Sequence, residues 1–181
     1  MRCGALVQSV RPQLKRSSAC LWAFVLPFTI IAAQAQSKKA ADEQDQKESY
    51  AYILTMEKIN KLEEARKAVN ELLEDNKQTS KRIDDDKSLL QGTLAQRARA
   101  LDINHPDVAA TIRKQGISTR EYLLAGHVLF KAFTLVGAKK AGEIQDYSNA
   151  GEGINPANLT LVEQHWEEIR KSMQQGTRLR M

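Results

Sequence analysis

The residues of this chain best suited to chemistry are three histidines, His105, His127 and His165. An imidazole binds metals and transfers protons near neutral pH, but a metal site needs further ligands at matching spacing. Only His165 has one, with Glu168 three residues later on a predicted helix. The paired Glu-x-x-His segments of di-iron bundles do not occur. A metal- or haem-binding bundle that uses His127 or His165 is therefore an alternative hypothesis, and the leading one includes no cofactor.

Catalytic motifs are missing from the sequence. It has no phosphate loop, no dinucleotide fingerprint and no Gly-x-Ser-x-Gly nucleophile turn. The Asp triplet 84–86 is expected near the first turn of a helix that begins at about Ser80, where the helix dipole favours negative charge. Because successive helical residues point about 100° apart, the triplet does not converge on one cation. These features favour a protein that is not an enzyme.

Residues 1–35 have the three parts of a secretory signal. A stretch with basic and no acidic residues precedes an apolar run, residues 20–33, and the small residues Ala33 and Ala35 form a cleavage site. Cleavage there makes Gln36 the new amino terminus. We therefore expect an exported protein, periplasmic or secreted.

The alternative for the same segment is an uncleaved membrane anchor. The apolar run is shorter than the roughly 20 residues of a spanning helix, and Pro27 interrupts it. We expect no stable membrane span after cleavage.

Removing residues 1–35 changes the composition that matters for function. The 27 basic and 22 acidic residues become 23 and 22, because this segment holds four basic residues and no acid. A nearly neutral domain gives no reason to expect a nucleic-acid partner. Cys3 and Cys20 also leave, so the mature chain lacks disulfides, thiolate chemistry and covalent haem attachment.

The rest of the chain predicts an all-α fold. We expect a polar, disordered leader over residues 36–48, a small helical bundle of four to five helices over 49–175, and a frayed basic tail over 176–181. Apolar residues recur at helical spacing over about 49–75 and 80–102. Shorter helices follow Pro106, Ser118 and Pro156, and residues 142–154 form a loop.

The segment 119–137 is the candidate binding element, because apolar residues cover most of its helical wheel. Such a helix is usually central in its bundle or covered by a partner. The candidate ligand-binding residues are Tyr122, His127, Phe130, His165 and Trp166.

Two segments resemble a group of uncharacterised exported bacterial proteins. They are His-Pro-Asp-Val-Ala-Ala-x-Ile-Arg-Lys-x-Gly-Ile-Ser-Thr-Arg-Glu-Tyr over residues 105–122 and Asn-Pro-Ala-Asn-Leu-x-x-Val-x-x-His over 155–165. The resemblance covers about residues 50–172 and implies a small helical exported protein of unknown role. It supplies no active site.

The sequence therefore predicts an extracytoplasmic binding or interaction module. Its partner would be an unknown protein, an envelope component or a small apolar ligand near helix 119–137. Besides the metal or haem alternative, a structural envelope protein remains open, with the charged segment 49–77 as its assembly surface.

Overall fold

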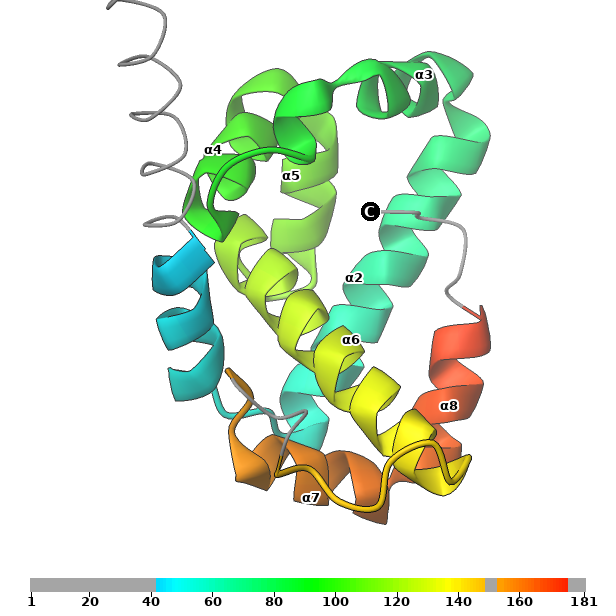
Figure 1. The fold of residues 1–181 in the computed structure, drawn as a ribbon. Helices are drawn as coiled ribbons and strands as arrows, with labels where there is room; N and C mark the ends of the chain where they lie inside the picture. Colours follow the sequence, from blue (N-terminus) through cyan, green and yellow to red (C-terminus); the bar gives the residue numbers. More distant parts are fainter. Residues whose placement is uncertain (1–41, 149–152, 176–181) are drawn as a thin grey trace, which may run out of the picture. The chain divides into compact units, whose positions relative to one another are not determined.

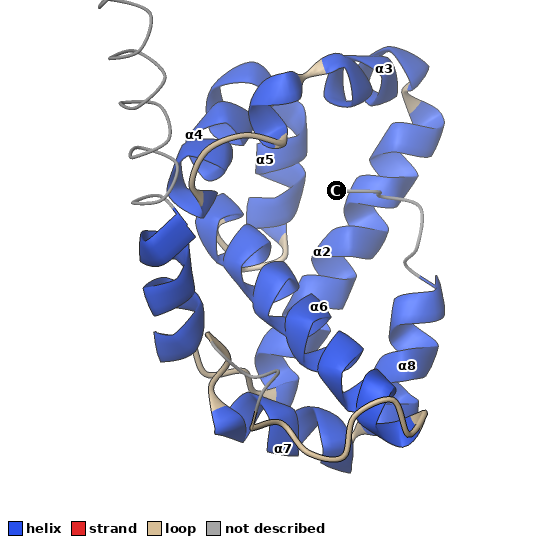
Figure 2. Ribbon diagram, viewed as in Figure 1, coloured by secondary structure: helices blue, strands red, loops and turns tan. Residues whose placement is uncertain are grey.

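The fold was taken from a computed structural model that describes residues 42–148 and 153–175. These residues belong to one unit, 38–181, and none of them is in a strand (Figure 2). The all-α class is thus confirmed. Residues 42–51 are helical. The helices that follow are α2 (Met56–Asp75), α3 (Lys77–Asp85), the 3-10 helix η1 (Lys87–Leu89), α4 (Leu94–Asn104), α5 (Pro106–Lys114), α6 (Thr119–Lys140), α7 (Pro156–Gln164) and α8 (Trp166–Gln175).

Helix α6 is the central element of this unit, as its apolar wheel predicts. It packs against α2, α4, α5 and α7 and crosses between them in Figure 1. Ser118 caps its amino end by accepting a hydrogen bond from the Glu121 amide at 3.1 Å. A capping box would also need the Glu121 side chain to accept from the Ser118 amide, but the Glu121 carboxylate accepts from the Tyr52 hydroxyl instead, at 3.1 Å.

The predicted number of four to five helices is not confirmed, because the long predicted helices are divided. The first is interrupted over residues 52–55, where Thr55 is extended and its side chain accepts from the Lys58 amide to begin α2. The last is divided at His165 into α7 and α8. Hydrophobic spacing continues across such breaks, so it does not reveal them.

The predicted helix 80–102 is wrong in its boundaries. The Asn76 side chain caps α3 by accepting from the Thr79 amide, so this helix begins before Ser80. The Asp triplet 84–86 consequently lies at the carboxyl end of α3, not in its first turn. Asp86 ends the helix and its carboxylate accepts from the Ser88 amide, and Thr93 then caps α4 through a capping box with Gln96.

Residues 42–48 of the predicted leader lie in a helix. This helix is held by its polar side chains: the Asp45 carboxylate accepts from the Leu94 amide at 2.9 and 3.0 Å. Glu48 pairs with Arg120 of α6 at 2.8 Å. Amino-acid composition alone does not predict these contacts with residues far away in the sequence.

The terminal predictions lie outside the described residues. They are the export signal 1–35 with its cleavage site at Ala33, Ala35 and Gln36, the leader residues 36–41, and the tail 176–181. None of the helices in the described part of the chain combines the length and hydropathy that a membrane span needs.

Candidate functional site

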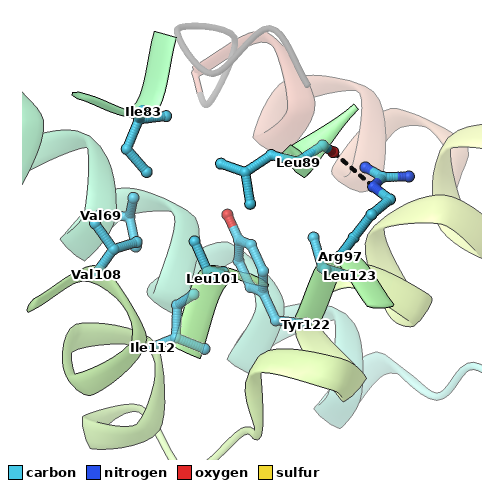
Figure 3. Close-up of a pocket in the computed structure, with 9 residues that line it drawn as sticks. All are labelled: Val69, Ile83, Leu89, Arg97, Leu101, Val108, Ile112, Tyr122 and Leu123. Atoms are coloured by element: carbon cyan, nitrogen blue, oxygen red, sulfur yellow. Dashed lines mark hydrogen bonds between the residues drawn. The ribbon is translucent and has the colours of Figure 1, made fainter. Parts of the chain in front are cut away.

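An apolar cavity lies where five helices meet beside η1, and Tyr122 is the one predicted site residue that lines it. Its volume is about 40 Å³. Its lining residues are Val69 from α2, Ile83 from α3, Leu89 from η1, Arg97 and Leu101 from α4, Val108 and Ile112 from α5, and Tyr122 and Leu123 from α6 (Figure 3). Apart from Arg97 and Tyr122, the lining is entirely aliphatic.

The hydroxyl group of Tyr122 is buried without a hydrogen-bond partner. The residue is only 2% exposed, and Figure 3 shows its hydroxyl oxygen directed into the space between Leu89 and Leu101. Leaving a buried hydroxyl unpaired costs about 1–3 kcal/mol, so buried tyrosines usually have a partner. This group is available to a molecule that enters the cavity.

Burial sets the protonation state of this hydroxyl. Desolvation is the largest influence and raises the pKa of Tyr122 to about 12, with the nearby charges of Arg66 and Glu63 acting in opposite directions. The phenol is therefore neutral at physiological pH and can donate one hydrogen bond as well as accept. It is not a base, and the cavity lining holds no nucleophile beside it.

Arg97 contributes its aliphatic stem to the cavity. Its Nε donates a hydrogen bond to the Leu89 carbonyl at 2.7 Å, and the guanidinium extends toward that carbonyl and away from the Tyr122 hydroxyl (Figure 3). Arginine covers apolar surface in this way while its charged end stays near water. Arg97 thus fastens η1 to α4 and leaves Tyr122 as the polar group that points inward.

His127 does not line the cavity. It is half-buried on α6, and its pKa is lowered by burial first and then by the charges of Lys131 and Arg97, which outweigh that of Asp45. Two cationic neighbours disfavour a bound metal ion. Among the described residues, no three His, Cys, Asp or Glu side chains gather where they could hold one.

His165 and Trp166 lie at the junction of α7 and α8 and are also absent from the cavity lining. The Trp166 ring stacks on Phe133 of α6, with ring centroids 4.5 Å apart and planes inclined by 12°. His165 contacts Glu168 at 3.4 Å. The ring stack fastens α8 to α6, so Trp166 has a packing role, whereas the His165–Glu168 contact is local to the α7–α8 junction.

Phe130 is separate from the other candidates. It is 61% exposed on α6. A single exposed aromatic side chain is common on protein surfaces and does not define an interface. The five predicted residues are therefore not brought together at one site.

Sequence reasoning missed two polar residues that organise the fold. Asn158 is 0% exposed, and its side chain bonds the main chain of Leu54 and Tyr52, each at 2.8 Å. Asp86 accepts hydrogen bonds from His105 at 2.9 Å and from Asn104 at 3.0 Å. Asn158 is also the first residue of a formal glycosylation sequon, which its burial makes inaccessible in the folded protein.

No family model, no curated protein and no solved structure matches this chain.

Proposed function

We propose that this protein is an extracytoplasmic helical binding protein. Its cavity beside Tyr122 would take a small, mainly apolar molecule that carries one hydrogen-bonding atom. The secretory features of residues 1–35 and the resemblance to exported bacterial proteins favour the location outside the cytoplasm. The observation that carries the binding proposal is the buried, unpaired Tyr122 hydroxyl in an aliphatic cavity.

The chemistry of the cavity defines the class of ligand. Its aliphatic lining excludes strongly polar or charged groups, since nothing there would replace their hydration. The Tyr122 hydroxyl provides one directed hydrogen bond, which suits an alcohol, phenol, ether or ketone oxygen. A hydrogen bond made where water is excluded discriminates strongly between such a molecule and its hydrocarbon counterpart.

The size of the cavity limits what fits without movement. Its volume of about 40 Å³ is well below the roughly 150 Å³ of an apolar cavity that holds benzene. A single small apolar group fits as the structure stands. A ring-sized ligand requires Ile83 and Leu89 to move outward.

The binding proposal is tested with xenon, phenol and toluene, followed by NMR of the isotope-labelled protein. We expect saturable shifts at Leu101 and Leu123 with xenon, and tighter binding of phenol than of its isostere toluene by about 5- to 10-fold, the value of one net hydrogen bond. In Tyr122→Phe the preference for phenol should disappear while xenon still binds. Absence of saturable shifts with all three probes would refute the proposal.

The export proposal needs its own measurement. The full-length chain is expressed in a Gram-negative bacterium, and the product is recovered from the periplasm and analysed by mass spectrometry. A product that begins at Gln36 supports export and cleavage. A full-length chain in the cytoplasm or membrane fraction contradicts them.

A further inference from the structure

The segment 77–92, which comprises α3, η1 and the turn that ends at Gly92, closes the cavity on one side. It supplies two lining residues, Ile83 and Leu89, and both are only partly buried. Thr79 is the one residue of this segment that is buried. The other walls come from α2, α4, α5 and α6, whose lining residues, Arg97 apart, are buried. The segment therefore adds little to the core that would hold it in place.

Two carboxylates fasten the segment to the region around the α4–α5 junction. Near its start, Asp107 of α5 accepts hydrogen bonds from Arg82 and from the Thr79 hydroxyl, both at 2.8 Å. Near its middle, Asp86 accepts from His105 at 2.9 Å and from Asn104 at 3.0 Å.

A third fastener is the hydrogen bond from Arg97 Nε to the Leu89 carbonyl. All three contacts join the segment to α4 or α5, and all three are polar. Such contacts can be replaced by water one at a time, which buried apolar contacts cannot. Regions with few buried apolar contacts and solvent-accessible hydrogen bonds open at a small fraction of the global unfolding free energy.

The ends of the segment are suited to act as hinges. Asn76 ends α2 and caps α3 in a non-helical conformation, with φ −123° and ψ 86°. Gly92 has φ +81°, a conformation that side chains other than glycine rarely adopt. Hinges of this kind concentrate a motion in a few residues while the helices stay intact.

We infer that residues 77–92 form a lid over the Tyr122 cavity, held shut by the carboxylates of Asp86 and Asp107 and opening to admit the ligand. The inference rests on the proposed function for the identity of the site. Opening at Asn76 and Gly92 removes Ile83 and Leu89 from the cavity and exposes Val69 and Leu101 behind them. Ligand entry therefore depends on local breakage of polar contacts while the bundle core stays folded.

The lid is tested without any ligand, by alkylation of a buried thiol with iodoacetamide. The full chain with Cys3→Ser and Cys20→Ser receives Val69→Cys, a nearly isosteric change at a cavity residue that is 1% exposed. A second protein receives Val162→Cys in α7, a core position that is 0% exposed and lies outside the cavity lining. We expect the thiol at position 69 to react at least about tenfold faster, since local opening is cheaper than global unfolding.

The fasteners are tested in the same background. Asp86→Asn and Asp107→Asn should each raise the alkylation rate at position 69 by about tenfold, the effect of losing a charge-assisted hydrogen bond. Global unfolding breaks the same contacts, so the rate at position 162 rises by at most the same factor and stays the slower of the two. Asp85→Asn is the matched control, since this neighbouring carboxylate is exposed, and it should change neither rate. If Val69→Cys perturbs folding, Leu101→Cys on α4 provides the same readout.

The outcomes separate the lid from the binding proposal. Equal alkylation rates at positions 69 and 162, or no effect of both Asp variants, overturn the lid even where the probes bind. Faster alkylation at position 69 without any probe binding leaves the motion intact but removes its role in ligand entry. Selective alkylation that phenol slows in proportion to its occupancy supports both.

Discussion

The carboxamide oxygen of Asn158 accepts a hydrogen bond from the Leu54 amide at 2.8 Å, although the two residues are 104 positions apart. The same side chain donates from Nδ2 to the Tyr52 carbonyl, also at 2.8 Å. One buried carboxamide thus satisfies a donor and an acceptor of the non-helical segment 52–55 that helical hydrogen bonds leave unpaired. The first turn of α7 and the entry to α2 are joined by this residue.

Asn158→Ala should destabilise the protein by about 3 kcal/mol, because it leaves the Leu54 amide and the Tyr52 carbonyl unpaired in the interior. Urea unfolding followed by circular dichroism measures the loss. Asn155→Ala is the matched control: this less buried asparagine caps α7 at the Ala157 amide, and its loss should cost only about 1 kcal/mol. A change below 0.5 kcal/mol, on the order of an ordinary surface substitution, would show that the Asn158 contacts contribute little.

Tyr122→Phe should leave the stability unchanged or raise it by about 1 kcal/mol, because it removes a buried hydroxyl without a partner and keeps the ring. The same variant should lose the preference for phenol over toluene. Stability is read from thermal unfolding and binding from the NMR titration. Marked destabilisation would mean that this hydroxyl serves the fold and not a ligand.

Two glycines of α6 provide a matched pair. A Cβ on Gly126 meets nothing closer than Leu62 Cδ1 at 4.0 Å, so Gly126→Ala should stabilise the helix by about 0.5–1 kcal/mol. A Cβ on Gly137 would lie 3.2 Å from Trp166 Cη2, and the stack on Phe133 restricts how far that ring can move. Gly137→Ala should therefore stabilise the protein much less than Gly126→Ala does, or not at all. Equal gains in melting temperature would contradict this role of the stack.

The lid should loosen in acid. Hydrogen bonds from Ser88, then Asn104 and His105, hold the pKa of the Asp86 carboxyl well below its usual range. The Ser88 bond lies within the lid, so opening breaks only the bonds from Asn104 and His105. A carboxyl with a lower pKa in the folded state contributes stability that is complete above its unfolded pKa of about 3.9 and is lost as the pH falls below it. Asp107 acts in the same direction: burial raises its pKa, but the Thr79 and Val108 hydrogen bonds and the Arg82 charge together lower it.

The measurement is the urea midpoint between pH 6 and pH 2.5, with hydrogen exchange of the lid amides at each pH. Asp86→Asn should flatten the acid dependence and increase exchange in residues 77–92 already at pH 6. If the urea midpoint falls equally at low pH in this variant and in the unaltered protein, Asp86 does not contribute to the acid dependence.

The all-α class and the central helix could be predicted from the sequence because both depend on local information. The apolar wheel of 119–137 and the caps at Ser118 and Asn155 are readable from spacing and side-chain type. The division of helix 80–102 depends on where the Asn76 and Asp86 side chains find amides, which hydrophobic spacing does not encode.

The candidate site was predictable only in part for the same reason. Tyr122 could be named because it lies on the apolar helix. That its hydroxyl has no partner depends on residues from four other helices and η1. His165 and Trp166 were candidates because of their residue types. The Phe133 ring and Gly137, which Trp166 contacts, lie on a different helix, so this packing could not be predicted from local sequence.

The bond between Leu54 and Asn158 also has a consequence for biosynthesis. A ribosome that adds about 5–20 residues per second needs roughly 5–20 s to extend the chain by the 104 positions from Leu54 to Asn158. During that interval the entry to α2 lacks its buried partner, Asn158. Asp45 and Glu48 likewise lack these distant partners until Leu94 and Arg120, which follow them by 49 and 72 positions, have been synthesised. The donor and the acceptor at the entry to α2 should therefore become paired only when α7 emerges.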